Sequence, residues 1–352
     1  MSAATMNGHG PGETIEQRVE VPTTTRSDWQ TDQEVRWCPG CGDYSILAAM
    51  QLAMPGMGIR REDTVVISGI GCAARFPYYM DTYGVHSIHG RAPAMATGLA
   101  LARPDLSVFV VGGDGDLLSI GGNHLLHALR RNVNLTILLF NNRIYGLTKG
   151  QYSPTSEVGK HTKSTPFGSV DAPLHPLAVA LGAGATFVAR THDMDRQGME
   201  AIFQRAHAHR GAAFVEILQN CNVFNDGAFT DVTGKSARDE MLIPLTHGEP
   251  VRFGEDGHAG IQVDLDGGRV VEVDEVGVES LYVHDEQRSS PTAAMALALM
   301  APEPTEPMPM GVFRDVQLPM HHTEEVAGPG TRDDLAALLN SGTTWTVDPE
   351  VG

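Results

Sequence analysis

Short, continuous runs of apolar and β-branched residues recur along the chain, separated by polar segments rich in glycine. The clearest runs are residues 106–111, LSVFVV, and residues 135–140, LTILLF. They are too short for buried helices and do not alternate with polar residues, so they predict strands of a parallel sheet covered on both faces. A third run, TVVIS at residues 64–68, predicts another strand that ends in a glycine-rich turn.

Helical patterns alternate with strand patterns as far as about residue 235. Helices are predicted at residues 43–54 and within HGRAPAMATGLALARPD and MEAIFQRAHAH. This alternation predicts an α/β fold with helices on both faces of a mostly parallel sheet, in a domain of residues 31–235. Residues 1–30 lack periodicity and predict a flexible N-terminal arm. Residues 236–352 hold a hairpin pattern, an Ala/Leu helix near Thr292 to Met300 and a Pro-rich stretch, and predict a peripheral C-terminal extension.

Polar residues follow both of the clearest strands. The first strand breaks into Gly112-Gly113-Asp114-Gly115, and the second ends in Asn141-Asn142. Because the carboxyl ends of parallel strands open on one crevice, Asp114 and Asn142 are expected to meet there. A carboxylate, an amide oxygen and a backbone carbonyl just beyond Asn142 suit Mg²⁺, which keeps positions for phosphate oxygens. A helix beginning near Ser119 would add its N-terminal partial charge, so the crevice predicts a diphosphate site.

The charge and the hydropathy of the chain exclude some functions. The formal net charge of the 352 residues is −18, which argues against binding to nucleic acid through Lys and Arg. No apolar run reaches the ~18 residues of a membrane span. The first residues lack the basic and apolar segments of a signal peptide. We therefore expect a cytoplasmic protein that binds neither nucleic acid nor membrane.

The four cysteines are Cys38, Cys41, Cys72 and Cys221. In a chain without an export signal, they are expected to be metal ligands or reactive thiols and not disulfides. Cys38 and Cys41 lie beside a predicted helix start, which favours the thiolate form. One C-x-x-C pair with two single cysteines departs from the two pairs of a zinc ribbon and suits an iron–sulfur cluster. A redox dithiol would leave Cys72 and Cys221 unexplained.

Residues 69–74, GIGCAA, also fit the glycine pattern of a dinucleotide site. The acidic residue expected about 20 positions later is missing, because His89 and Gly90 stand there, and this argues against nicotinamide binding. His89 lies on an entry loop, where it could reach a cofactor or satisfy backbone groups. The sequence leaves both roles open.

GDG between two buried strands, with NN closing the second strand, resembles the thiamine diphosphate signature. The chain from about Arg36 to Asn225 resembles the β subunits of 2-oxoacid:ferredoxin oxidoreductases of the 2-oxoglutarate type. The matching motifs are WCPGCGDYSIL, GIGCAARF, HGRAPAMATGLALARPDL, GGDGDLLSIGGNHLLHALRRN, NNRIYGLTKGQYSPTS and NCNVFND. This resemblance implies a thiamine-diphosphate-binding fold. It also implies oxidative decarboxylation of a 2-oxoacid with coenzyme A, with electrons passed through a 4Fe-4S cluster to ferredoxin.

The resemblance also implies roles for individual residues. Mg²⁺ would be held by Asp114, Asn142 and the backbone carbonyl of Ile144, and the cluster by the four cysteines. Contacts to thiamine diphosphate are implied for Ile70, Gly71, Cys72, Ala73, His89, Gly115, Asp116, Gly146 and Leu147.

No motif in the chain supplies the carboxylate that activates thiamine at its pyrimidine ring. In the family this group comes from the α subunit, so the resemblance implies a heteromer, with two copies of each subunit. A non-oxidative thiamine decarboxylase and an electron-transfer module are the alternatives. The first would normally carry a pyrimidine-binding domain in a longer chain, and the second would not need GDG and NN.

Two cationic residues bear on the choice of substrate. Arg75 follows Cys72 by three positions, and Lys149 lies just past the expected magnesium ligands. Cations there could bind a second carboxylate, which favours 2-oxoglutarate, giving succinyl-CoA, over pyruvate or a broad range of 2-oxoacids. Either residue could instead be a surface charge, and Arg75 could bind the phosphates of coenzyme A.

Overall fold

The buried strands predicted from the apolar runs lie side by side at the centre of the sheet. The computed structural model describes residues 22–300, 305–321, 337 and 339–341. In it, these strands are β1 (Thr64–Ser68), β3 (Ser107–Gly113) and β4 (Leu135–Asn141). Every residue of β1 and β4 is buried. Since both faces of the sheet are covered, no polar residue alternates along these strands.

The central sheet has eight strands in the order β2-β1-β3-β4-β8-β7-β13-β9. The strands β2 (Tyr83–His86), β7 (Phe187–His192) and β8 (Ala212–Leu218) run parallel to β1, β3 and β4. The strand β13 (Met308–Asp315) pairs antiparallel with β7, and β9 (Leu242–Leu245) pairs parallel with β13. The predicted α/β fold with a mostly parallel sheet is confirmed.

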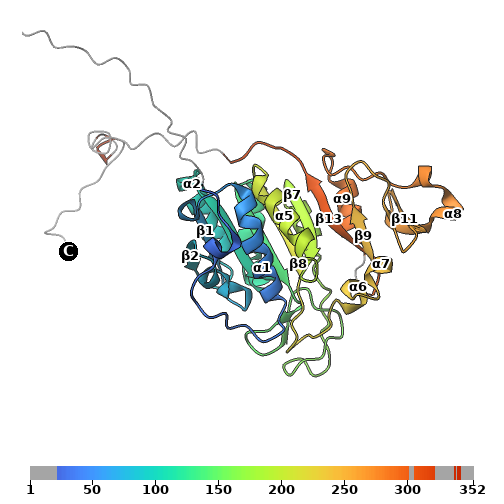
Figure 1. Cartoon of the computed structure of the whole chain (residues 1–352), viewed down its shortest axis with the longest axis horizontal. Coiled ribbons are helices and arrows are strands. Elements are labelled where there is room, and N and C mark those ends of the chain that lie inside the picture. The colour runs from blue at the N-terminus through green and yellow to red at the C-terminus, as the bar shows by residue number, and fades with distance from the viewer. Residues whose placement is uncertain (1–21, 301–304, 322–336, 338, 342–352) are drawn as a thin grey trace, which may run out of the picture.

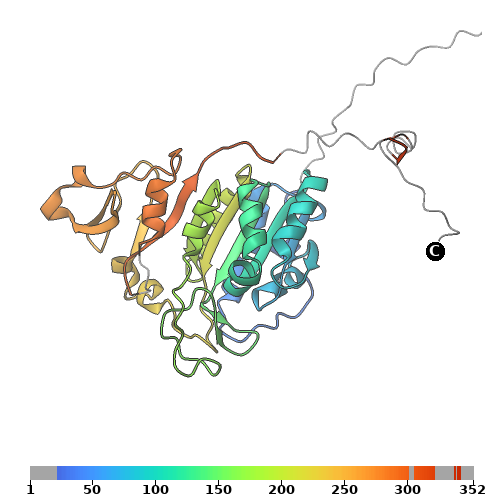
Figure 2. The same ribbon diagram turned by 180° about the vertical axis from the view of Figure 1, so that it is seen from behind.

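Helices cover both faces of this sheet, as predicted. Figure 1 shows α1 (Asp43–Ala53) and α5 (Arg196–Ala208) on one face. Figure 2 shows α2 (Ala92–Ala102), α3 (Gly122–Arg130) and α4 (Pro176–Gly182) on the other. Strand side chains alternate between the two layers. In β1, Val65 and Ile67 enter one hydrophobic core and Val66 the other.

The predicted N-terminal arm is only partly described. Residues 1–21 lie outside the described residues. Arg26–Trp29 form the short 3-10 helix η1, and Trp29 is fully buried against the helical layer that contains α1. For these residues the prediction of a flexible arm is wrong. A lone tryptophan in a polar segment has no periodic partners in sequence, so its burial became visible only in the fold.

The predicted C-terminal extension shares the central sheet with the domain that precedes it. Both β9 and β13 come from this range, so the boundary predicted at residue 235 does not separate two sheets. The sequence did not predict β13, because it contains Pro309 and Gly311, and both residue types are rare inside strands. The predicted hairpin is confirmed as β11 (Ala259–Asp264) and β12 (Gly267–Glu272), and the predicted helix as α9 (Thr292–Ala298).

The hairpin joins β10 (Arg252–Phe253) in a small three-stranded sheet on the right of Figure 1. The remaining short helices are η2 (Met54–Met57), η3 (Arg61–Asp63), η4 (Ala73–Tyr79), α6 (Thr230–Thr233), α7 (Arg238–Met241), α8 (Val273–Val276) and η6 (Val278–Ser280). Among the described residues, no helix has the length and apolar character needed to cross a membrane.

Candidate functional site

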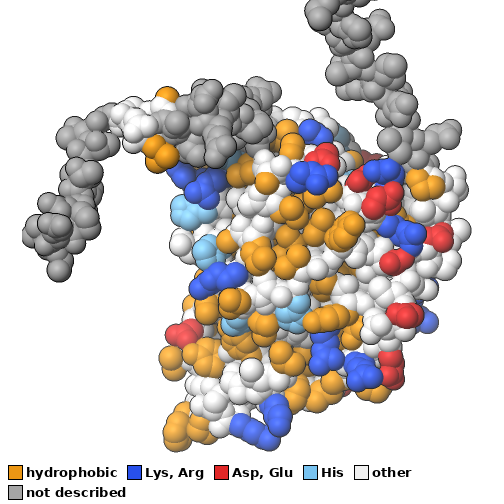
Figure 3. Space-filling view, turned by 90° about the vertical axis from the view of Figure 1, so that its left-hand side faces the viewer, with side chains coloured by type: hydrophobic (Ala, Val, Ile, Leu, Met, Phe, Trp, Pro, Cys, Tyr) orange, Lys and Arg blue, Asp and Glu red, His pale blue; other side chains and the backbone are white. Residues whose placement is uncertain are grey.

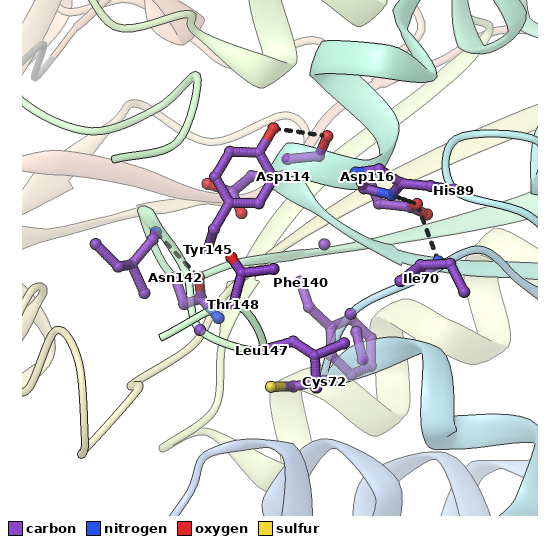
Figure 4. A pocket seen from close by; sticks show the side chains of 16 residues that line it. Ile70, Cys72, His89, Asp114, Asp116, Phe140, Asn142, Tyr145, Leu147 and Thr148 are labelled. Atoms are coloured by element: carbon purple, nitrogen blue, oxygen red, sulfur yellow. Dashed lines mark hydrogen bonds and ion pairs between the residues drawn. The ribbon is translucent and has the colours of Figure 1, made fainter. Parts of the chain in front are cut away.

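The carboxyl ends of β1, β3 and β4 meet at one edge of the sheet, the lower edge in Figure 1, and the loops that leave them form a pocket. Figure 4 shows this pocket from close by. Every residue that the resemblance implied for thiamine diphosphate or Mg²⁺ lines it: Ile70, Gly71, Cys72, Ala73, His89, Asp114, Gly115, Asp116, Asn142, Ile144, Gly146 and Leu147. The structure therefore brings together residues that are far apart in sequence. GIGCAA belongs to this pocket and not to a separate dinucleotide site.

Asp114 lies directly after β3 and is 2% exposed. Its Oδ2 accepts hydrogen bonds from Ser153 Oγ and Thr155 Oγ1, each at 2.5 Å. Burial raises the pKa of Asp114, and the two hydroxyl groups oppose that shift. No Lys or Arg is among the described residues that line the pocket, so no full positive charge of the chain faces this carboxylate. A bound cation would supply that charge.

Asn142 reaches the same pocket from the end of β4 (Figure 4). Its Oδ1 accepts a hydrogen bond from the backbone N–H of Ile144 at 3.1 Å, and its Nδ2 donates to Gln219 Oε1 at 2.8 Å. These bonds fix the orientation of the amide. A carboxylate and an oriented amide oxygen in one pocket are ligands that Mg²⁺ prefers, so the residues present fit this ion.

The helical segment after β3 begins earlier than predicted. The π-helical segment η5 (Gly115–Ile120) follows Asp114 at once and leads into α3, whereas the sequence predicted a start near Ser119. The glycines around Asp114 suggested a loop and hid the first turn. Tyr145 packs so closely here that a Cβ on Gly115 would lie 2.0 Å from its ring, and the Tyr145 hydroxyl donates to the Gly115 carbonyl at 3.2 Å. A glycine is therefore required at position 115.

Asp116 ties two pocket loops together. Its Oδ1 accepts hydrogen bonds from the backbone N–H of Ile70 at 3.0 Å and of Gly90 at 2.7 Å, and lies 2.6 Å from His89 Nδ1. Of the two roles left open for His89, the structure favours the pocket role, because the ring contacts the side chain of Asp116. Its Nε2 is then the nitrogen available to a ligand.

The four cysteines line a second cavity, together with Trp37 and Phe224. Two of them approach Gly146, where a Cβ would lie 3.6 Å from both Cys72 Sγ and Cys221 Sγ. Within the described part of the chain, no three His, Cys, Asp or Glu side chains are arranged to hold a single metal ion. Four thiols that line one cavity match the number and type of ligands that a 4Fe-4S cluster takes.

The prediction that the helix start favours the thiolate of Cys41 is wrong. Burial raises the pKa of Cys41, and the neighbouring Asp43 carboxylate raises it further; the same two causes raise the pKa of Cys72 to about 12. Asp43 is 1% exposed and lines the cysteine cavity, and burial raises its own pKa to about 7. In the sequence, Asp43 stood out only as the first residue of a predicted helix. Its position directly after the C-x-x-C pair was the signal that could have identified it.

We call the pocket at the ends of β1, β3 and β4 the thiamine pocket, and the cavity lined by the four cysteines the cysteine cavity. The two share a wall made of Cys72, Asn142, Gly146 and Leu147. Arg75 and Lys149 line the cysteine cavity and are absent from the described lining of the thiamine pocket. Arg75 Nη1 donates to the backbone carbonyl of Arg36 at 3.4 Å. Lys149 is exposed, and its φ of +76° is unusual for a residue with a side chain. Both cations therefore lie beside the shared wall, on the cysteine side.

Residues 69–217 match the family model described as thiamine pyrophosphate enzyme, C-terminal TPP binding domain. The fold and the site thus define the thiamine-diphosphate-binding part of an α/β enzyme. The chain is 54% identical over 340 residues to the 2-oxoglutarate oxidoreductase subunit KorB of Mycobacterium tuberculosis. The aligned part covers 93% of this chain and 91% of that protein. It is 46% identical over 200 residues to subunit beta of the 2-oxoacid:ferredoxin oxidoreductase 1 of Aeropyrum pernix, covering 57% and 63% of the two chains.

Among solved structures, the chain resembles a 2-oxoglutarate:ferredoxin oxidoreductase from Magnetococcus marinus with 2-oxoglutarate, coenzyme A and succinyl-CoA bound. The TM-score is 0.73 with 33% sequence identity, over 94% of this chain and 100% of that chain. The chain belongs to the family of 2-oxoacid:ferredoxin oxidoreductase β subunits, as its motifs predicted. This membership decides against the two alternatives left open, a non-oxidative decarboxylase and an electron-transfer module.

Replacing Asp114 by alanine should abolish the retention of thiamine diphosphate, because the pocket loses its buried carboxylate. The measurement is the thiamine content of the purified protein. Ser153→Ala, which removes one hydroxyl donor to Asp114, should weaken Mg²⁺ affinity by about 10- to 100-fold. An Asp114→Ala protein that keeps its thiamine diphosphate would contradict the assignment.

Proposed function

We propose that this chain is the β subunit of an enzyme that oxidatively decarboxylates 2-oxoglutarate with coenzyme A. The products are succinyl-CoA and CO2, and the electrons pass through an iron–sulfur cluster to ferredoxin. The observation that carries the proposal is the wall shared by the thiamine pocket and the cysteine cavity. Bound thiamine diphosphate supplies the electron sink for decarboxylation of a 2-oxoacid. The Magnetococcus marinus relative, whose structure contains 2-oxoglutarate, coenzyme A and succinyl-CoA, supports this choice of substrates.

In this proposal, Asp114, Asn142 and the backbone carbonyl of Ile144 hold Mg²⁺, and the ion holds the diphosphate. The absence of Lys and Arg from the described lining of the pocket supports a metal ion in this role, since the diphosphate needs a positive partner. Gly115 and Asp116 lie in the first turn of η5, at the helix end whose positive partial charge favours phosphate oxygens. Ile70 to Ala73, His89, Gly146 and Leu147 contact the rest of the cofactor.

Cys38, Cys41, Cys72 and Cys221 hold one 4Fe-4S cluster in this proposal. Burial raises the pKa of Cys41 and of Cys72 and so favours their protonated form, whereas a bound metal would hold them as thiolates. The apolar side chains of Trp37 and Phe224 line the cavity and would limit access of water to the cluster. Trp37 also donates its indole N–H to the Cys72 carbonyl at 2.7 Å, which fixes one wall. The free thiols fit the cytoplasmic location expected from the sequence, which stays part of this proposal.

Anaerobically purified protein should contain about four iron atoms per chain, the number that four thiolate ligands hold in one cubane cluster. The measurement is the iron content, together with the EPR spectrum of the reduced protein. Cys221→Ser should lose most of the iron, since Cys221 is buried and lines the cysteine cavity. Zinc in place of iron would contradict the cluster and indicate a structural site.

An α subunit completes the active site in this proposal. The carboxylates that line the described pocket are Asp114 and Asp116, and each already accepts hydrogen bonds from the chain itself. In this proposal, the α subunit supplies the carboxylate that activates thiamine. Figure 3 shows hydrophobic side chains gathered on the side of the molecule that carries β2 and α2, and the exposed ones here include Tyr83, Ile88 and Met95. An exposed apolar surface next to the pocket supports a subunit interface there.

The purified chain without its α subunit should show no oxidation of 2-oxoglutarate, and adding the α subunit should restore it. Ile88→Asp, which places a charge at a 74% exposed apolar position beside His89, should reduce co-purification with the α subunit. Leu265→Asp is the matched control, because Leu265 is fully exposed in the turn between β11 and β12 and lines neither cavity. Activity of the isolated chain would refute the divided active site.

Arg75 and Lys149 select a substrate with a second carboxylate in this proposal. Both line the cysteine cavity beside the shared wall, so they are placed to attract an anionic tail that extends from the reacting pocket. The rival role for Arg75, binding the phosphates of coenzyme A, uses the same charge. The assembled enzyme can distinguish these roles, because pyruvate has no second carboxylate.

Lys149→Ala should lower kcat/KM for 2-oxoglutarate by about 10- to 150-fold, which corresponds to the ~1.5 to 3 kcal/mol typical of a hydrogen bond to a charged group. The value for pyruvate should change little. Lys163→Ala is the control, because Lys163 is an exposed lysine that lines neither cavity. Equal losses on both substrates would assign Lys149 to structural support or to coenzyme A.

A further inference from the structure

A buried ion pair lies inside the central sheet, outside the residues assigned to any cofactor. Arg190 of β7 and Glu216 of β8 are directly opposite each other in the strand register. Arg190 Nε donates to Glu216 Oε2 at 2.8 Å, and the two residues are 5% and 1% exposed. Replacing such a pair by apolar residues is often neutral or stabilising, so its presence in a sheet made mainly of apolar side chains calls for a role other than stability.

The second carboxylate oxygen of Glu216 points toward the candidate magnesium site. Glu216 Oε1 accepts a hydrogen bond from Asn141 Nδ2 at 2.7 Å. Asn141 is the last residue of β4 and immediately precedes the proposed magnesium ligand Asn142. Because a carboxylate can only accept hydrogen bonds, Glu216 fixes the Asn141 amide with its nitrogen toward β8 and its oxygen toward the loops.

The oriented oxygen of Asn141 holds the turn that carries the magnesium ligands. Asn141 Oδ1 accepts a hydrogen bond from the backbone N–H of Arg143 at 3.3 Å, within a turn in which Arg143 has a φ of +56°. The same oxygen lies 2.9 Å from Thr155 Oγ1, which in turn is 2.5 Å from Asp114 Oδ2. The side chains of Asn141, Thr155 and Asp114 are all buried, so water does not substitute for these contacts.

We propose that Glu216 is a positioning residue for the magnesium site. It acts through Asn141, whose fixed amide oxygen accepts a hydrogen bond from the backbone N–H of Arg143 and so holds the turn that carries Asn142. Arg190 neutralises the charge of Glu216. This inference rests on the proposed function, because it presupposes that Asp114 and Asn142 bind Mg²⁺.

Arg190 also links these contacts to β13. Its Nη1 donates to the backbone carbonyl of Pro309 at 3.5 Å, and its guanidinium lies 5.7 Å from the centre of the Phe313 ring. The C-terminal part of the chain therefore packs against the residue that neutralises Glu216. A strand remote in sequence from the site thus contributes to the support of the magnesium ligands.

Two double variants test the proposal in the complex with the α subunit, after removal of Mg²⁺ and thiamine diphosphate. Both replace the ion pair without leaving a buried charge. Arg190→Met with Glu216→Gln keeps a carbonyl acceptor for Asn141 Nδ2, whereas Arg190→Met with Glu216→Met removes that acceptor at similar volume. The measurement is the Mg²⁺ concentration that half-saturates binding of thiamine diphosphate, followed by calorimetry, together with the thermal unfolding temperature of each protein.

The Glu216→Met double variant should need about 10- to 100-fold more Mg²⁺, while the Glu216→Gln double variant stays close to the wild type. The two should unfold at similar temperatures, which separates positioning from stability. Equal Mg²⁺ requirements in both variants overturn the proposal. If the Glu216→Met variant does not fold, Asn141→Ala must raise the Mg²⁺ requirement, and an unchanged requirement overturns the proposal. A wild-type complex that binds thiamine diphosphate without Mg²⁺ contradicts the magnesium site itself.

Discussion

The buried carboxylate of Asp114 is the charge around which this site is arranged. A carboxylate without a positive partner is costly at 2% exposure, and the described pocket offers it no Lys or Arg. The chain compensates in part with hydroxyl donors from Ser153 and Thr155, which requires the loop after β6 (Gln151–Tyr152) to fold back over the end of β3. The remaining charge suits a divalent cation. In the proposed function, Asp114 thus links the conformation of this loop to the binding of a metal ion.

Cys72, Asn142, Gly146 and Leu147 line both cavities, so the two cavities are neighbours. In the proposed function, electrons that leave a substrate in one cavity reach an acceptor in the other, and the shared wall keeps that path short. Gly146 lies close to the sulfur atoms as well, since a Cβ at this position would be in ordinary contact, at 3.6 Å, with both Cys72 Sγ and Cys221 Sγ. In this proposal, decarboxylation and electron transfer take place in neighbouring cavities.

The described lining of the pocket includes two carboxylates, Asp114 and Asp116, and each accepts hydrogen bonds from the chain itself through one oxygen. The hydrophobic side chains gathered on the side that carries β2 and α2 fit the subunit interface proposed there. The high net negative charge of −18 then has to be carried elsewhere on the chain. The composition, the exposed patch and the incomplete pocket are consistent with one arrangement, in which the active site lies between two chains.

The sequence by itself determined the elements and chemistry that are encoded locally. Continuous apolar runs identified β1, β3 and β4, the GDG and NN ends identified Asp114 and Asn142, and the spacing of four cysteines suggested a cluster. Only the tertiary structure revealed β13 in the central sheet, the burial of Asp43 beside the cysteines and the path from Glu216 to Asn141. It also placed Arg75 and Lys149 at the cysteine cavity. The physical reason is that a strand or a motif depends on neighbouring residues, whereas burial of a charge and the partner that compensates it depend on how distant strands pack together.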